Sequence, residues 1–248
     1  GKTATLSFMQ PEGKLQSEHP WPAPWLSENG NSAFYLTNSI HFLDQPGEWY
    51  QDFKKHKLYY WPKLGEKMQT AKVVAPVLEN LFKIQGTPDR TVSYVFVKGI
   101  GFQHSNWLLP SKQGHVPLQA GMYMLDAYKL KIPGTPDKET LENQAWVGRP
   151  AAAVEVSFAK HTGFDSCRFE HLASTGLDFK KGTSNSLVKG NLFKDIGGSA
   201  FLIGTFSDEA TEVHIPYNPI DEREICTNDT FENNLITDAT NEDWGCVG

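Results

Sequence analysis

Apolar and polar residues alternate in short segments through the second half of the chain. Residues 154–158 read Val-Glu-Val-Ser-Phe, and residues 177–179 read Leu-Asp-Phe. Alternation with a period of two is typical of β-strands, and no apolar stripe of helical period lies between the segments. Glycine and asparagine residues between them supply turns. The pattern therefore predicts strands of about four to six residues in place of helices.

The segments recur at a fixed interval. Phe169 and Phe193 lie 24 positions apart in similar contexts, and Phe231 belongs to a third copy 38 positions further on. The longer interval indicates a polar insert near residues 207–224. Periods of this size are typical of a solenoid, in which each repeat covers the apolar face of its neighbour. Because each period holds short strands and lacks the consensus of a leucine-rich repeat, we expect an all-β chain folded as a parallel β-helix.

The first 72 residues follow a different pattern. They begin with a segment rich in Pro and Trp, and residues 43–62 contain two aromatic-rich stretches on either side of a basic tip, which predicts a β-hairpin. We expect residues 1–72 to form an N-terminal segment and hairpin packed on the solenoid. Residues 73–248 would form its coils, beginning with a short apolar segment at 73–75 and interrupted by a long loop insert at 110–150.

Composition narrows the possible partners. The chain has 248 residues, of which 39% are hydrophobic, enough for one continuous core. Its net charge of −6, with no basic run longer than Lys54-Lys55, argues against nucleic acid and anionic membranes. No apolar run is long enough to span a membrane, so we expect no membrane insertion. Cys167, Cys226 and Cys246 lack metal-binding spacing, and we expect buried thiols, with a disulfide as the alternative, no metal and no cofactor.

Two acidic residues are candidates for catalysis. If Val154 and Leu177 point inward, strand alternation turns Glu155 and Asp178 outward on neighbouring coils, about 4.8 Å apart along the stack. Retaining glycosidases hold their two carboxyl groups roughly 5–5.5 Å apart. Carboxylates this close raise the pKa of one partner, as a general acid requires. The alternative is that both side chains are part of an ordinary solvated face.

Aromatic residues in the inserts are candidates for sugar binding. Trp107 and Trp146 border the long insert, where they could be sugar platforms or lids over exposed coil edges. Glu242, Asp243 and Trp244 directly precede a predicted strand, and acidic groups beside an indole suit a sugar ring. A plain loop is the alternative for this last group.

A polar residue recurs two positions after each repeat phenylalanine. These residues are His104, His171, Asp195 and Asn233. A polar residue at one register position most simply satisfies backbone groups at a turn. We therefore predict that His171 and Asp195 bond to nearby backbone and hold no metal ion between them.

Several motifs together resemble a known family. They lie at residues 46–50 (Pro-Gly-Glu-Trp-Tyr), 58–62, 101–107, 151–155 and 167–171 (Cys-Arg-Phe-Glu-His). In order and content they are similar to the right-handed parallel β-helix glycoside hydrolases, closest to family 141, which has α-L-fucosidase and xylanase members. The α-galactosidases of family 110 are more distant. The resemblance implies a right-handed helix and an exported bacterial enzyme, periplasmic or at the cell surface, that acts on a complex plant or host glycan.

The resemblance also implies that important residues are missing from this chain. The family's acid and base are expected in a Tyr-Asp-Gly-Gly-Ala-Ile-Tyr type motif and an Asp-Glu-Gly-Ser type motif, and neither occurs in these 248 residues. The first residues read as mid-protein, no signal peptide begins at Gly1, and the last residues stop within a predicted strand. We therefore expect a piece of a longer protein, with the true acid and base beyond residue 248.

Three classes of function remain open. A glycoside hydrolase would use two carboxylates as acid and base on an oligo- or polysaccharide. A β-helix polysaccharide lyase would need a Lys or Arg base beside acidic residues, and the predicted strands show no such cluster. A non-catalytic glycan-binding β-helix becomes the best interpretation if the chain is complete.

Overall fold

The computed structural model describes Ser7 and residues 26–27, 30–31, 36–108, 115–117, 121–130, 145–204 and 219–242. Within these ranges the chain is all β, as expected, and its helices are short 3-10 helices such as η1 (Ile40–Phe42) and η3 (Glu222–Glu224). None of the helices in these ranges is long and apolar enough to cross a membrane. The chain forms two compact units: residues 24–75, and residues 1–23 together with 76–248.

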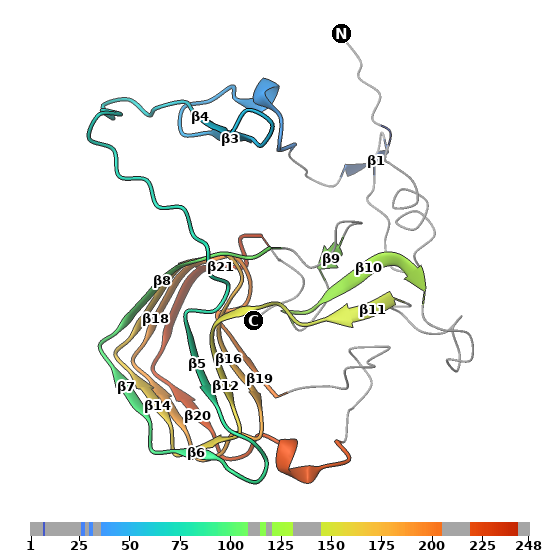
Figure 1. The fold of residues 1–248 in the computed structure, drawn as a ribbon, viewed down its shortest axis with the longest axis vertical. Coiled ribbons are helices and arrows are strands. Elements are labelled where there is room, and N and C mark those ends of the chain that lie inside the picture. Colours follow the sequence, from blue (N-terminus) through green and yellow to red (C-terminus); the bar gives the residue numbers. More distant parts are fainter. Residues whose placement is uncertain are drawn as a thin grey trace. The chain divides into compact units, whose positions relative to one another are not determined.

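The larger unit contains three parallel sheets of four strands each (Figure 1). The first sheet has the order β19 (Phe201–Ile203), β16 (Thr175–Lys181), β12 (Ala152–Ser157), β5 (Phe82–Gln85). The second has the order β20 (Thr230–Glu232), β17 (Leu187–Lys189), β14 (Gly163–Asp165), β7 (Phe96–Lys98). The third has the order β21 (Leu235–Ala239), β18 (Leu192–Ile196), β15 (Arg168–Leu172), β8 (Gly101–Ser105). Each successive stretch of chain thus adds one strand to each sheet in turn.

Smaller elements complete this unit. A short parallel pair, β13 (Ala159–Lys160) and β6 (Val92–Ser93), lies between the first and second sheets in the chain order. The insert forms an antiparallel sheet of β9 (His115–Pro117), β10 (Tyr123–Leu130) and β11 (Ala145–Gly148). The predicted stacking of residues 154–158, 177–179 and 200–203 is confirmed, because their strands β12, β16 and β19 pair in parallel in the first sheet.

Left-handed backbone recurs at the same three turns of every repeat. The members of each series are separated by the same 67, 24 and 43 residues. The series are Tyr94, His161, Asn185 and Asn228; Gly99, Ser166, Gly190 and Asn233; and His104, His171, Asp195 and Asp238. Glycine, asparagine and aspartate adopt this conformation at low cost, which explains why such residues mark the turns. The 24-residue period read from the sequence is therefore a period of backbone conformation.

The third copy of the repeat lies elsewhere than predicted. Ile236, not Phe231, pairs with Phe193, so the interval is 43 residues rather than 38. Phe231 instead pairs with Val188 in the second sheet. As a result Asp238, and not Asn233, occupies the turn of His171 and Asp195. Short strands of the second and third sheets have the same alternation, so the sequence pattern alone could not tell them apart.

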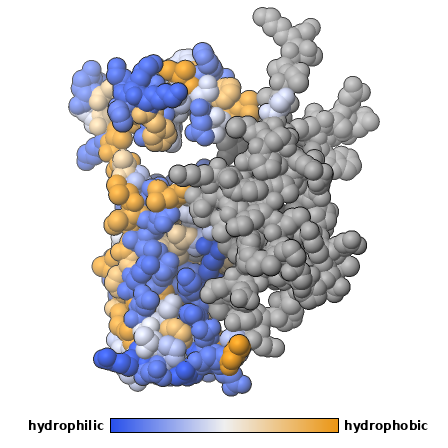
Figure 2. Space-filling model, turned by 45° about the vertical axis from the view of Figure 1, so that its right-hand side comes forward, coloured by the Kyte–Doolittle hydropathy of each residue, from blue (hydrophilic) through white to orange (hydrophobic). Residues whose placement is uncertain are grey.

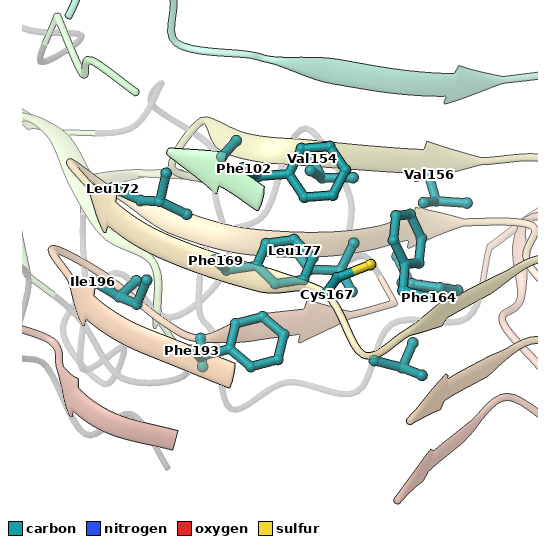
Figure 3. Packing of buried hydrophobic residues seen from close by; sticks show 14 of the residues in the cluster. Phe102, Val154, Val156, Phe164, Cys167, Phe169, Leu172, Leu177, Phe193 and Ile196 are labelled. Atoms are coloured by element: carbon teal, nitrogen blue, oxygen red, sulfur yellow. The ribbon is translucent and has the colours of Figure 1, made fainter. Parts of the chain in front are cut away.

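Stacked aromatic rings fill the space between the sheets (Figure 3). Phe102, Phe169 and Phe193 come from three successive strands of the third sheet. The ring centroids of Phe169 and Phe193 are 4.5 Å apart with planes 9° from parallel, and both side chains are fully buried. Cys167 lies among them as a buried free thiol, as expected. Cys226 is a half-buried free thiol, and Cys246 lies outside the described residues.

The smaller unit contains the predicted hairpin. Its strands β3 (Trp49–Asp52) and β4 (Lys57–Tyr60) pair antiparallel, and the rings of Tyr50 and Tyr59 stack across them at 6.2 Å. A two-stranded element, β1 (Leu26–Ser27) with β2 (Gly30–Asn31), precedes it. The coils were predicted to begin with the apolar segment at residues 73–75, but these residues are exposed and belong to no strand.

Candidate functional site

A row of charged residues crosses the outward face of the first sheet. Lys83 on β5, Glu155 on β12 and Asp178 on β16 are direct neighbours in the strand register. Their neighbours Val154, Val156, Leu177 and Phe179 are fully buried in the core, so alternation directs the charged residues to the opposite face. The structure therefore brings together the two carboxylates that the sequence singled out, and adds a lysine beside them.

Glu155 is held by two neighbours. Asn80 Nδ2 donates a hydrogen bond to Glu155 Oε1 at 2.8 Å, and Lys83 Nζ lies 3.1 Å from Glu155 Oε2. The Glu155 side chain is 20% exposed. Because each oxygen has one partner and retains a free lone-pair direction, the carboxylate is oriented but still accessible to a ligand.

Asp178 is buried and held by an arginine. Arg149 donates hydrogen bonds from Nε to Asp178 Oδ2 at 2.7 Å and from Nη2 to Asp178 Oδ1 at 2.5 Å. The side chains of Asp178 and Arg149 are 2% and 13% exposed. Burial raises the pKa of the Asp178 carboxyl, and the bonds from Arg149 partly offset this rise. The negative charge of Glu155 also raises the pKa of Asp178, as the smallest of these contributions.

A β-bulge lies beside the carboxylates. Val156 pairs with Phe179 and Ser157 pairs with Lys181, so Lys180 is an extra residue on β16 with no partner on β12. Bulges of this kind redirect a side chain and are common next to functional sites. Lys180 lies close enough to Asp178 to lower its pKa.

Two adjoining pockets lie over this face. The first, of about 310 Å³, is lined by Glu79, Trp107, Leu108, Tyr123, Arg149, Pro150, Ala151, Glu155, Asp178 and Lys180. The second, of about 220 Å³, is lined by Lys83, Ile84, Gln85, Gly86, Glu155, Ser157, Phe158, Lys180 and Lys181. Glu155 and Lys180 belong to both linings, which makes the two pockets neighbours. Figure 2 shows hydrophilic residues beside hydrophobic ones on the described surface of the protein.

An aromatic pair lines the larger pocket. The ring centroids of Trp107 and Tyr123 are 5.8 Å apart, and Tyr123 is buried. The backbone N–H of Leu108 donates to Glu79 Oε1 at 2.8 Å, which fixes the chain directly after Trp107. Trp107 therefore lies in the same pocket as Glu155 and Asp178, as a sugar platform would require.

The other predicted binding residues either do not line this pocket or lie outside the described residues. Trp146 is on β11, and its side chain is outside the described residues. Glu242 is exposed, its backbone N–H donates to Gly197 O at 2.9 Å, and it lines neither pocket. Asp243 and Trp244 lie outside the described residues.

The basic residues of the site correct an expectation from the sequence. We expected no cluster of Lys or Arg with acidic residues on the strands, yet Lys83, Arg149 and Lys180 surround Glu155 and Asp178. Lys83 could have been predicted from the sequence, because it pairs with Glu155 as soon as β5 is recognised as the strand next to β12. Lys180 lies two positions after Asp178 and could have been found from alternation, whereas Arg149 lies in a connection and has no such signal.

The polar residues at the third turn also differ from expectation. His171 Nδ1 lies 2.6 Å from Asp195 Oδ2, so these side chains contact each other rather than backbone groups. His104 stacks on His171 with ring centroids 5.2 Å apart. Among the described residues, no group of three or more His, Cys, Asp and Glu side chains is arranged to hold a metal ion.

The fold and the site define an all-β protein with a polar, aromatic-lined pocket on the outside of a parallel sheet. Residues 1–63 match the family model of the GH141 insertion domain. A solved structure described as a glycoside hydrolase is 46% identical to the chain, with a TM-score of 0.82, and the alignment covers 96% of this chain. These matches confirm the resemblance to glycoside hydrolases of family 141.

The solved relative is a much longer protein. This chain spans 41% of its length. Curated proteins provide no match to the chain.

Proposed function

We propose that this chain is part of a glycoside hydrolase and that its outward first-sheet face binds the glycan. The observation that carries this proposal is the Glu155–Asp178 pair in one pocket with Trp107. Carboxylates bind sugar hydroxyls, and an indole covers the apolar side of a sugar ring. The relation to a glycoside hydrolase at 46% identity supports the same function.

The three parallel sheets support a more specific architecture. We propose that they are the walls of one right-handed parallel β-helix, with residues 73–248 as its coils and residues 1–72 as its N-terminal segment and hairpin. Support comes from the left-handed turns, which recur at constant intervals in three series. A rigid stack of this kind fixes residues on neighbouring strands at a constant spacing, which a two-carboxylate site requires.

The two carboxylates would have different roles in acid/base chemistry. Glu155 is accessible, and each of its carboxylate oxygens has one polar partner. It is therefore the group able to exchange a proton with a sugar oxygen or with water. Asp178 is enclosed by Arg149, so its role is to supply fixed charge and to orient the site. If the true acid and base lie in later coils, Glu155 would instead bind substrate hydroxyls.

Glu155→Gln distinguishes these possibilities because it keeps the shape and removes the charge. We would measure hydrolysis of aryl α-L-fucosides, aryl xylosides and pectic oligosaccharides by the complete protein. A catalytic Glu155 predicts a loss of about 100-fold or more in kcat. A binding role predicts an affinity weaker by about 1–3 kcal/mol with turnover largely kept. Unchanged affinity and turnover would remove this face from the site.

A polysaccharide lyase is the second candidate, and the cluster of Lys83, Arg149 and Lys180 favours it. A lyase needs a basic group to remove a proton beside a uronate carboxylate, whose charge a cation must neutralise. The products separate the two reactions. Hydrolysis adds water and gives saturated sugars, whereas elimination leaves a carbon–carbon double bond that absorbs ultraviolet light. Binding of glycan with neither product would indicate a non-catalytic glycan-binding protein.

We also propose that the protein is exported and acts on a complex plant or host glycan in a polysaccharide-degrading bacterium. This rests on the family resemblance alone. Fractionation of the source cells, with antibodies against the protein, tests it. Recovery in the periplasm, at the cell surface or in the medium is expected, and recovery in the cytoplasm would contradict it.

A further inference from the structure

We propose that the smaller pocket is a subsite for an anionic sugar, and that Lys180 is the residue that selects it. This inference rests on the proposed function, since it names the substrate class of the same face. The chemistry recognised is a compact negative group on a sugar ring, either the carboxylate of a uronic acid or a sulfate ester.

The charges lining the smaller pocket are unbalanced. Among its described lining residues are Lys83, Lys180 and Lys181, together with one acidic residue, Glu155. Lys83 is already paired with Glu155 at 3.1 Å, and Lys181 with Glu224 at 3.0 Å. Lys180 is half-buried and forms no ion pair with any of the described residues. A cation removed from part of its water and left without a partner attracts an anion strongly, because the surroundings screen it less than bulk water would.

The position of Lys180 follows from strand alternation and the β-bulge. Lys180 lies two residues after Asp178, on the far side of the buried Phe179, so alternation directs it outward. The bulge between the pairs Val156–Phe179 and Ser157–Lys181 leaves it without a partner on β12. It lines both pockets, directly beside Asp178 and Glu155. A glycan could therefore place one ring against Trp107 and the adjoining ring over Lys180.

The polar groups around Lys180 complete a sugar subsite. Gln85 and Ser157 line the pocket and can bond to ring hydroxyls, while Lys180 provides the only unpaired charge among its described lining residues. The turn beside it is held in an unusual conformation, since Phe158 has a φ of 48°, a value that bulky residues rarely adopt. Strained backbone of this kind is found most often where a site must keep a fixed shape.

The test uses three trisaccharides of the galacto series that carry carboxylates, neutral methyl esters or a sulfate. We would measure the binding of trigalacturonate, of its methyl ester and of an O-sulfated trigalactoside to the complete protein by calorimetry. The proposal expects trigalacturonate or the sulfated sugar to bind at least about tenfold more tightly than the neutral ester, with the preference reduced by added salt. The tighter of the two identifies the anion as carboxylate or sulfate.

Lys180→Gln should reduce this preference about tenfold, because it weakens the binding of the anionic sugars more than the binding of the neutral ester. The matched control is Lys189→Gln, which removes the same charge from β17 in the second sheet, where Lys189 pairs with Glu232 at 3.3 Å. Lys180→Arg keeps the charge and should retain most of the preference. A thermal unfolding temperature equal to that of the unmodified protein shows, for each variant, that a change in binding is not due to misfolding.

Two results would overturn the inference, and they are distinguishable from failure of the proposed function. If the protein binds all three sugars equally, the glycan site stands and the anionic subsite is wrong. If Lys180→Gln keeps the full preference, the anion binds elsewhere. Absence of binding to all three sugars, and to the aryl fucosides and xylosides of the hydrolysis assay, would contradict the proposed function itself.

Discussion

Arg149 donates two hydrogen bonds to Asp178, at 2.5 and 2.7 Å, and joins the connection before β12 to the middle of β16. The two residues lie 29 positions apart and are both largely buried. A bidentate pair of this kind fixes direction as well as charge. It therefore anchors the end of the long insert to the sheet face that carries Glu155, so that insert and strand face form one site.

Loss of this arginine should be costly. Arg149→Gln leaves the Asp178 charge buried with no full partner, and we expect the free energy of unfolding to fall by about 3 kcal/mol or more. Urea denaturation measures it. The control is Lys189→Gln, because the Lys189–Glu232 pair is half exposed on both sides and should contribute less than about 1 kcal/mol. Equal small effects for both variants would contradict the role assigned to Arg149.

The stacked phenylalanines should hold the sheets together. Phe193 is fully buried and stacks on Phe169 at 4.5 Å, so Phe193→Ala removes a ring and leaves a cavity. We expect a loss of about 3–5 kcal/mol in the free energy of unfolding. Phe231→Ala is the comparison, because Phe231 is only partly buried at the edge of the cluster, and a smaller loss is expected. Urea denaturation of both variants should show the larger loss for Phe193→Ala, and the reverse order would contradict this expectation.

Two glycines with left-handed backbone should respond differently to alanine. Gly182 has a φ of +62°, and a Cβ there would lie 2.8 Å from the carbonyl oxygen of Arg223 and against the Phe158 ring. Gly99 has a similar φ of +67°, but nothing lies within 4 Å of its Cβ position. Both variants bear the strain of left-handed alanine, about 1 kcal/mol, and only Gly182→Ala adds a clash. Thermal unfolding should therefore show the larger loss for Gly182→Ala.

Stability should depend on pH through Glu170 on β15. The hydrogen bond from Arg168, at 2.9 Å, lowers the pKa of the Glu170 carboxyl, and a bond from Gln103 adds to this effect. Because the folded-state pKa lies below the unfolded value of about 4.3, the ionised form stabilises the fold. This contribution is complete above the unfolded pKa and is lost as the pH falls through the folded pKa.

Glu170→Gln should therefore flatten the loss of stability in acid. We would compare urea midpoints of the two proteins from neutral pH down to pH values below the unfolded pKa. The variant should be less stable at neutral pH, and the difference should shrink in acid. A difference that stays constant across this range would show that Glu170 does not carry the effect.

The resemblance to family 141 and the placement of the two carboxylates could both be predicted from local sequence patterns. Glu155 and Asp178 could be predicted as neighbours because a 24-residue period and strand alternation fix both the partner strand and the face. The same reasoning reached Trp107, whose position follows directly from the end of β8. It could not reach Arg149, because a connection has no periodic signal.

The sequence by itself determined the all-β class, the hairpin at residues 43–62 and the outward pair Glu155–Asp178, since each depends on residues close together or one period apart. Only the tertiary structure decided that Ile236 pairs with Phe193, that His171 contacts Asp195 and that Arg149 binds Asp178. The pairing of Ile236 depends on the insert near residues 207–224, whereas the two side-chain contacts depend on side-chain directions that alternation does not specify. Insert length changes the register along the chain without changing the alternation of apolar and polar residues, so the pattern alone leaves several pairings equally consistent.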